Sequence, residues 1–216
     1  MKDAWNIGED GILSVTDLLE SKNIKVVEIK ADSSFDGLSG YVNNDENMPF
    51  VVVNKSFDVE RLRFTGLHEL GHLVMNLPEE MEKKDKERLC NLFASEMLIS
   101  RNIFVDVLGE RRSDISLQEL KVLQAVYGIS VDALMFKAKT VGVISESKYT
   151  SFCIRKNKSL AFKDAVERSS YRGVEESSRF DRLVYRALAS DMISCSKAAV
   201  LLNEPMEEVK NKLELV

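Results

Sequence analysis

Apolar residues recur along the chain with two different spacings, and the strand-like spacing is confined to the first quarter. Helical spacing predicts an amphipathic helix and two long helices, at 12–22, 58–77 and 79–98. Short runs rich in β-branched residues predict three strands, at 24–29, 38–42 and 49–54. Because the strands come first and helices follow to the end, this order predicts an α+β fold.

The second half of the chain is predicted to be helical except for one weakly patterned stretch. Helices at 116–127 and 131–139 flank a Gly-Ile-Ser turn whose Ser130 is placed to cap the second helix. Three short helices are expected near the end, at 179–189, 196–202 and 206–213. We therefore expect a main domain over 1–145, an irregular connection over 146–175 and a small C-terminal helical module over 176–216.

Pro49 opens the third predicted strand, after a polar turn expected at 43–48. Proline has no backbone N–H to donate to a neighbouring strand, and within sheets it is found mainly at edges, bulges and strand starts. We therefore expect the strand at 49–54 to lie at the edge of the sheet.

Composition and charge exclude several classes of protein. Hydrophobic residues make up 44% and charged residues 30%, as in an ordinary globular protein. Residues 1–144 hold 17 basic and 24 acidic side chains, which argues against broad nucleic-acid binding there. The sequence shows neither a signal-peptide pattern nor an apolar run of membrane-spanning length. Three widely separated cysteines without a CxxC pair favour free thiols, so we expect a cytoplasmic protein.

Residues 68–72 read His-Glu-Leu-Gly-His, and the two histidines of this motif are the only ones in the chain. On a helix, residues four apart share a face, so both imidazoles can reach one metal ion. Zinc favours nitrogen ligands, and a catalytic zinc site leaves one position open for water. Glu69 could then act as the general base that takes a proton from that water. The alternative is a chance match, but the strong helical pattern around the motif favours a Zn²⁺ site held by His68 and His72.

A third protein ligand is expected from the next predicted helix. Glu87 and Asn91 are four residues apart and share a face that Ala94 and Leu98 continue. At about 100° per residue, Glu96 falls on the opposite side of that helix. We therefore predict Glu87 as the third metal ligand and Asn91 as a partner that orients a ligand. The alternative for Glu87 is a solvated charge in an acidic and basic run.

The run RFTGLHELGHLVM, followed by ERLCNLFASEML, resembles the ImmA/IrrE family of metallopeptidases. In that family HELGH is followed by a helix of the form E-x-x-A-N-x-F-A-x-x-L-L, often ending in proline. Cys90 replaces the usual alanine, and Ser100 stands where proline is frequent, so the helix end is expected to differ. The resemblance covers roughly 1–145 and includes FDGLSGYVN, PFVVVN and a helix-turn-helix-like segment at 115–140. The matching residues of the second helix are Glu87, Cys90, Asn91, Phe93, Ala94, Met97 and Leu98.

The resemblance implies a zincin-like fold in which a small sheet of about three strands packs on the HExxH helix. It places the zinc ligands at His68, His72 and Glu87 and the general base at Glu69. It also implies a protein substrate, typically a transcriptional repressor whose cleavage relieves repression. Many relatives carry an N-terminal repressor-type helix-turn-helix domain, and we expect a form without it here.

Two other functions stay open at this stage. The chain could be a non-catalytic metal-binding regulator that acts through protein or DNA contacts, or a metal-free remnant. Intact Glu69 argues against the remnant, because a structural zinc site needs no general base. Direct nucleic-acid binding is not expected, since the segment 206–213 has adjacent glutamates and no arginine. Tyr41 is one candidate for stabilising an oxyanion, with simple packing as its alternative.

Overall fold

The computed structural model describes residues 1–42 and 47–214, so the polar turn expected at 43–48 lies largely outside the described residues. The chain divides into two compact units, Met1–Glu175 and Glu176–Val216, and each has its own cluster of buried apolar side chains. None of the helices that the structure describes has the length and apolar composition needed to span a bilayer.

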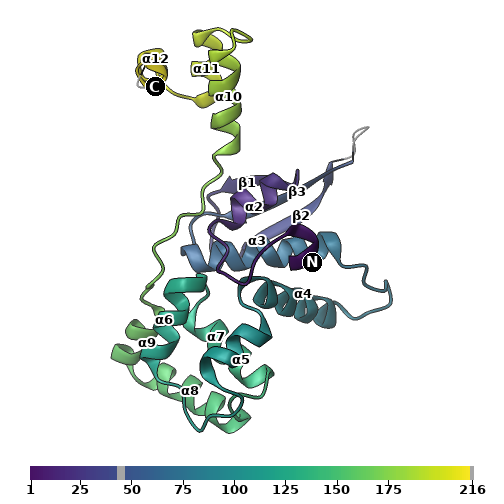
Figure 1. The fold of residues 1–216 in the computed structure, drawn as a ribbon, viewed down its shortest axis with the longest axis vertical. Coiled ribbons are helices and arrows are strands. Elements are labelled where there is room, and N and C mark those ends of the chain that lie inside the picture. The colour runs from purple at the N-terminus through teal and green to yellow at the C-terminus, as the bar shows by residue number, and fades with distance from the viewer. Residues whose placement is uncertain (43–46, 215–216) are drawn as a thin grey trace. The chain divides into compact units, whose positions relative to one another are not determined.

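The first unit combines a small sheet with helices (Figure 1). Its strands are β1 (Lys25–Ile29), β2 (Gly37–Val42) and β3 (Met48–Asn54). Its helices are α1 (Lys2–Trp5), α2 (Val15–Ser21), α3 (Val59–Val74), α4 (Lys83–Leu98), α5 (Arg101–Leu108), α6 (Leu117–Tyr127), α7 (Val131–Thr140), α8 (Glu146–Lys158) and α9 (Leu160–Glu167). The predicted α+β class is therefore confirmed.

The strands lie in the order β1-β3-β2, so β3 is the central strand. It pairs in parallel with β1 and antiparallel with β2, and the prediction that 49–54 forms the edge is wrong. The reason lies in the register. The β1 ladder begins where Lys25 faces Phe50, one residue beyond Pro49, so β1 requires no N–H donor at Pro49. The edge strand on the other side is β2.

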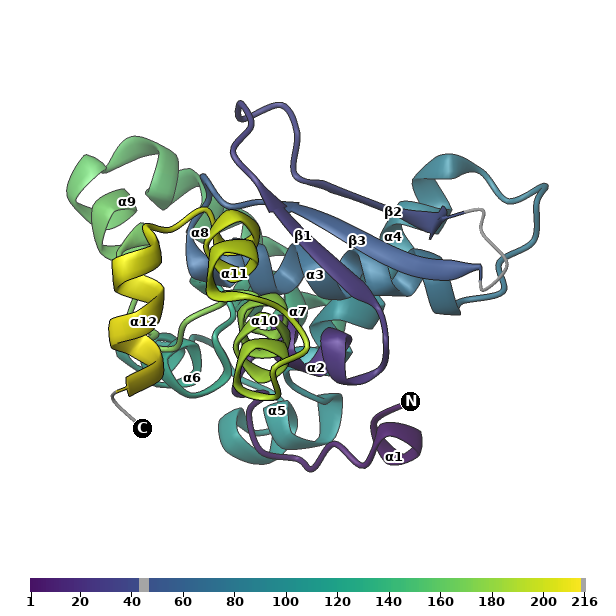
Figure 2. The same ribbon diagram turned by 90° about the horizontal axis from the view of Figure 1, so that it is seen from above.

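Helix α3 covers one face of this sheet, as Figures 1 and 2 both show. Val51 and Val53 of the central strand are buried toward the helix side, together with Leu67 and Leu70 of α3. This arrangement confirms the expected small sheet packed on the helix that carries the HExxH motif. The sheet thereby holds β2 beside the polar face of α3.

Helix α4 packs along α3 at close range because of one glycine. A Cβ atom added at Gly71 would lie 3.3 Å from the Cα of Cys90 and 3.3 Å from the ring of Phe93. A side chain at position 71 would require these neighbours to move by a few tenths of an ångström. The glycine inside the motif therefore brings the residues of α4 up to the two histidines.

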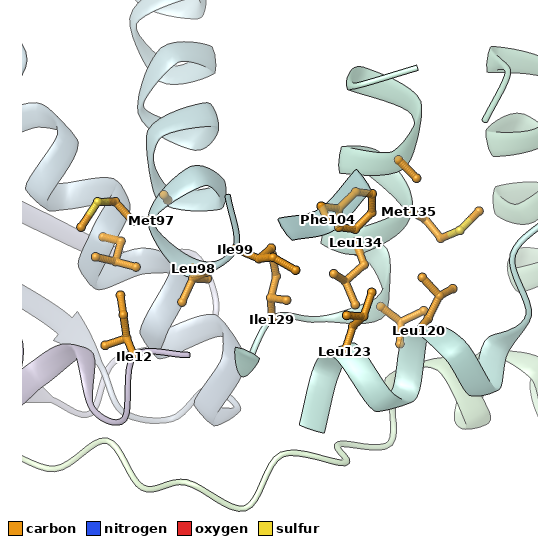
Figure 3. Close-up of a cluster of buried hydrophobic side chains, with 14 of the residues drawn as sticks. Ile12, Met97, Leu98, Ile99, Phe104, Leu120, Leu123, Ile129, Leu134 and Met135 are labelled. Carbon is orange, nitrogen blue, oxygen red and sulfur yellow. The ribbon is translucent and has the colours of Figure 1, made fainter. Parts of the chain in front are cut away.

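The largest apolar cluster continues from the sheet and α3 into the helices that follow. Figure 3 shows Ile99 and Ile129 between side chains of the α4 end, such as Leu98, and those of α6 and α7, such as Leu123 and Leu134. All five of these side chains are buried. Ser100, expected to change the helix end, starts a new helix, because its hydroxyl accepts a hydrogen bond from the N–H of Ile103.

The helix pair predicted at 116–127 and 131–139 is confirmed by α6 and α7, and Ser130 caps α7 as expected. The irregular connection expected over 146–175 is not what the structure shows, because α8 and α9 occupy residues 146–167. Phe152 and Val166 of these helices are buried in the main cluster. Helix α8 has few apolar residues, so its sequence carries little periodic signal, and the cap provided by Ser145 supplies the start.

The second unit consists of α10 (Arg179–Ala189), α11 (Cys195–Leu202) and α12 (Met206–Glu214), which confirms the three short helices predicted there. Val184 and Leu188 of α10 are buried with Ala198 of α11 and Val209 of α12. The turn between α11 and α12 begins at Asn203 in the left-handed conformation, at φ 52°, which asparagine tolerates better than most residues.

Candidate metal centre

Helix α3 places His68 and His72 on one face, one turn apart. The two ring centroids are 4.8 Å apart, and the two Nε2 atoms approach to 3.1 Å. The rings are only partly exposed, with 15% of the His68 side chain and 31% of the His72 side chain accessible. The two imidazoles therefore point the same nitrogen at one position in space.

Helix α4 brings Glu87 to the same position. Its Oε2 lies 3.1 Å from Nε2 of His68 and 3.7 Å from Nε2 of His72. Tetrahedral zinc with bonds of about 2.0–2.1 Å requires neighbouring ligand atoms about 3.3 Å apart. The three observed separations, 3.1, 3.1 and 3.7 Å, bracket that value. The three side chains therefore fit a metal ion, and two nitrogens with one carboxylate oxygen suit zinc.

Asn91 fixes the chemical form of His68. Its Oδ1 lies 2.9 Å from Nδ1 of His68, and a carbonyl oxygen can only accept a hydrogen bond. With the amide in this orientation, Nδ1 of His68 is the donor, and Nε2 is the ring atom that faces Glu87. The structure thus places Asn91 where a partner that orients a metal ligand is expected.

Cys90 contacts Nδ1 of His72, as Asn91 contacts Nδ1 of His68. Its Sγ lies 3.4 Å from Nδ1 of His72, and the residue is fully buried. Burial raises the pKa of this thiol to about 11, with further contributions from the charges of Glu87 and Glu69. The sulfur therefore stays protonated at neutral pH and is a neutral neighbour of the ring. Sequence reasoning noted Cys90 only as a replacement for alanine, and its contact with His72 could not be predicted from spacing.

Glu69 lies beside the three converging side chains but is not one of them. It is 8% exposed, and its Oε2 accepts a hydrogen bond of 2.7 Å from the hydroxyl of Ser39 on β2. Gly37 allows β2 to come this close: a Cβ there would lie 2.7 Å from Cγ2 of Thr65 and 3.4 Å from Cγ of Glu69. Ser39 was missed by sequence reasoning, although it lies in the strand predicted at 38–42.

The site opens into a cavity of about 440 Å³ between β2, α3 and α4. His68, Glu69, His72 and Glu87 all line it, and an ion pair between Arg61 and Asp36 stands at its wall. A metal ion at the three ligands and a water near Glu69 would share this one space.

Two other residues considered from the sequence lie elsewhere. Both carboxylate oxygens of Glu96 are engaged away from the histidines, by the N–H of Arg101 and by Lys137, as its predicted position on the opposite helix face requires. The hydroxyl of Tyr41 donates to the carbonyl of Leu73 at 3.1 Å, at the end of α3. That hydrogen bond supports the packing alternative for Tyr41.

Comparison with known proteins agrees with this geometry. No curated protein matches the chain. The family model of the peptidase M78 group, described as the IrrE N-terminal-like domain, matches residues 19–139. That match covers more than half of the chain and includes the sheet, the HExxH helix, the helix of Glu87 and the α6–α7 pair. The chain therefore belongs to the peptidase M78 family, the ImmA/IrrE group of metallopeptidases.

Proposed function

We propose that the protein is a zinc-dependent endopeptidase that hydrolyses a peptide bond in a partner protein, and that this partner is a transcriptional repressor. One observation carries the enzymatic part of the proposal. Three ligand atoms converge, while Glu69 lines the same cavity outside the ligand set, held by Ser39. A purely structural metal site does not require a carboxylate that lies beside the ion without binding it.

The residues divide the reaction between them. His68, His72 and Glu87 would hold the ion, which when bound supplies a Lewis acid that acidifies water and polarises a carbonyl. Glu69 accepts the proton of the attacking water as the carbon–oxygen bond forms. It then passes this proton to the amide nitrogen as the carbon–nitrogen bond breaks. The hydrogen bond from Ser39 holds the carboxylate in position for both transfers.

The substrate would lie in extended form along β2. This strand pairs only with β3 among the described strands, and its residues Gly37 and Ser39 are next to Glu69. Added strands bind through main-chain hydrogen bonds, which supply affinity independently of the side chains. The binding edge is therefore β2, in place of β3.

The reaction would take place in a reducing compartment, the cytoplasm, where a repressor is also found. All three cysteines, Cys90, Cys153 and Cys195, are free, and Cys90 is buried against His72. Oxidation of that thiol would disturb the histidine it contacts. We do not propose that the chain itself binds DNA.

The test compares the wild-type protein with Glu69→Gln and with Glu80→Gln, a matched change at an exposed position outside the cavity. Zinc content should be about one ion per chain in all three proteins, because Glu69 is not a ligand. New protein N-termini in cells that make each variant are identified by terminal labelling and mass spectrometry. Loss of the general base should reduce their formation by about 10²–10⁴-fold in Glu69→Gln alone.

Two results would contradict the proposal in different ways. If Glu69→Gln produced the same new termini as the wild type, Glu69 would not be the base, and a non-catalytic regulator would become the better account. If cleavage depended on Glu69 but fell on proteins that do not bind DNA, the peptidase would stand and the repressor would be the wrong substrate.

A further inference from the structure

A second cavity, here called the side pocket, adjoins the metal-site cavity. It has a volume of about 330 Å³ and lies between α3, α4 and α7. Phe64 and Asn91 line both cavities, and Asn91 is the residue that contacts His68 at 2.9 Å. The side pocket therefore begins one side chain away from a predicted metal ligand.

The charged groups in the wall of the side pocket are already paired. Lys137 is almost completely buried, forms an ion pair with Glu96 and lies 3.4 Å from the hydroxyl of Ser95. The other oxygen of Glu96 accepts from the N–H of Arg101 at 3.0 Å. Because Lys137 and Glu96 already have hydrogen-bond partners within the fold, a ligand in the side pocket does not need to carry a charge.

The remaining surface of the side pocket is mainly hydrocarbon. Phe64 and Leu92 line it from the α3 and α4 side, and Ala133, Phe136 and Val141 line it from the α7 side. A cavity of about 150 Å³ is enough to hold a benzene ring, so 330 Å³ accommodates a large aliphatic or aromatic side chain. At about 330 Å³ the side pocket is at the lower end of the range of ligand pockets, about 300–1,000 Å³, which suits one side chain better than a larger guest.

We propose that the side pocket binds one large apolar side chain of the substrate, such as leucine, methionine or phenylalanine, close to the bond that is cut. This inference rests on the proposed peptidase function and adds a preference for one type of residue beside the bond that is cut. The nearness of the two cavities, which share Phe64 and Asn91 in their walls, carries it, since a polypeptide at the metal site has a neighbouring side chain within reach of the side pocket. The pocket thereby selects the site of cleavage by hydrophobic fit.

The matched variants are Ala133→Trp, which fills the side pocket from α7, and Ala125→Trp, the same change at an exposed position of α6 outside the pocket. Zinc content and the thermal unfolding transition establish that each variant is folded and loaded. Phe136→Ala, at a side chain that is 43% exposed, enlarges the pocket and provides a second variant if Ala133→Trp does not fold.

In the first experiment, the zinc-loaded proteins are incubated with a library of synthetic peptides of mixed sequence, and cut positions are identified by mass spectrometry. The wild type and Ala125→Trp should prefer large apolar residues over alanine at one position by about tenfold or more. Ala133→Trp should lose this preference in favour of small residues, and Phe136→Ala should weaken it. Unchanged preferences in both pocket variants, with cleavage intact, would overturn the side pocket and leave the peptidase standing.

The second experiment needs no cleavage, so it separates the two proposals. N-acetyl-leucinamide and N-acetyl-alaninamide are titrated into zinc-loaded Glu69→Gln protein, and the amide signals of α7 are followed by NMR. Half-saturation of the α7 shifts should require about tenfold less of the leucine probe than of the alanine probe. Adding Ala133→Trp should abolish the difference. If the wild type cuts no peptide but this selectivity is found, the pocket stands and the peptidase is in doubt; equal binding of both probes refutes the pocket.

Discussion

Helix α3 carries two polar clusters that are built in opposite ways. The first, here called the closed cluster, is centred on Arg63 and Glu175, whose side chains are 0% and 2% exposed and form an ion pair. Gly128, in the left-handed conformation at φ 58°, makes room for the guanidinium, because a Cβ there would lie 2.4 Å from Nε. The guanidinium also donates to the main-chain carbonyls of Ile12, Leu13, Tyr127 and Gly128.

The carboxylate of Glu175 is equally well satisfied. It accepts hydrogen bonds of 2.9 Å from the N–H groups of Val15 and Thr16, at the start of α2, in addition to the bond from Arg63. The closed cluster thus joins segments from four parts of the first unit and leaves no donor or acceptor for a ligand. Such an arrangement can only stabilise the fold.

The second, here called the open cluster, consists of His68 and His72, which begin less than two turns further along the same helix, and of Glu87 on α4. Its facing atoms are lone-pair donors 3.1–3.7 Å apart, and its side chains are 15–41% exposed. Asn91 and Cys90 contact the outer nitrogens of the rings, while the inner Nε2 atoms face each other and the carboxylate of Glu87. The comparison indicates that a polar cluster stabilises the fold when its donors and acceptors are all paired within the protein. It can bind a ligand when several lone-pair atoms face one common point.

The largest expected effect tests the closed cluster. Arg63→Ala leaves Glu175 buried without its counter-charge, which should lower the free energy of unfolding by about 3–5 kcal/mol. Urea denaturation followed by circular dichroism measures this loss. Zinc bound per folded chain should not change, because Arg63 contacts none of the three ligands.

Arg61→Ala is the matched control for that experiment. Arg61 lies on the same helix and pairs with Asp36, but both side chains are about half exposed. Exposed ion pairs contribute about 0–1 kcal/mol, so the control should be nearly as stable as the wild type. Similar losses in the two variants would show that burial does not distinguish the two pairs, and the comparison would fail.

A smaller effect is expected where the open cluster is supported from outside. Asn91→Ala removes the hydrogen-bond partner of Nδ1 of His68. Loss of such a partner of a metal ligand typically lowers the metal affinity by about 10–100-fold. Zinc affinity is measured by competition with a chromogenic chelator. The metal-free protein should lose little stability, because Asn91 is exposed.

Asn102→Ala provides the control, since Asn102 is exposed on α5 and contacts neither histidine. Its zinc affinity should equal that of the wild type. If Asn91→Ala also bound zinc with wild-type affinity, the hydrogen bond to His68 would have no part in holding the site.

Much of the open cluster could be predicted because its information is local. His68 and His72 are one helical turn apart, and the four-residue spacing of Glu87 and Asn91 places both on one face of the next helix. The periodic apolar residues of α3 and α4 allowed both helices to be predicted. Only the approach of α4 to α3 is tertiary, and Gly71 inside the motif makes room for it.

The order of the strands and the closed cluster could not be predicted in this way. The central position of β3 depends on where the β1 ladder begins, which no pattern within the strand records. Arg63 and Glu175 are more than a hundred residues apart, and a lone arginine in a helix reads as a surface charge. Ser39 was missed for the same reason, since its role exists only because Gly37 lets β2 reach Glu69.

The smallest expected effect concerns the contact that connects β2 with the open cluster. Ser39→Ala removes the hydroxyl that donates to Glu69, while His68, His72 and Glu87 keep all their contacts. A hydrogen bond to a carboxylate is worth about 1.5–3 kcal/mol, but water in the cavity can replace part of it. We therefore expect kcat to fall about tenfold on a substrate identified by its new N-termini, with KM and zinc content unchanged.

Ser39→Thr keeps the hydroxyl and should restore most of this kcat, which a merely structural role of the strand would not require. Ser34→Ala serves as the control, because the hydroxyl of Ser34 donates to Asp32 in an exposed loop and does not reach Glu69. A change in KM instead of kcat would assign Ser39 to substrate binding along β2. A change in zinc content would mean that the contact between Ser39 and Glu69 also affects metal binding. Glu69 could then no longer be treated as separate from the three ligands of the open cluster.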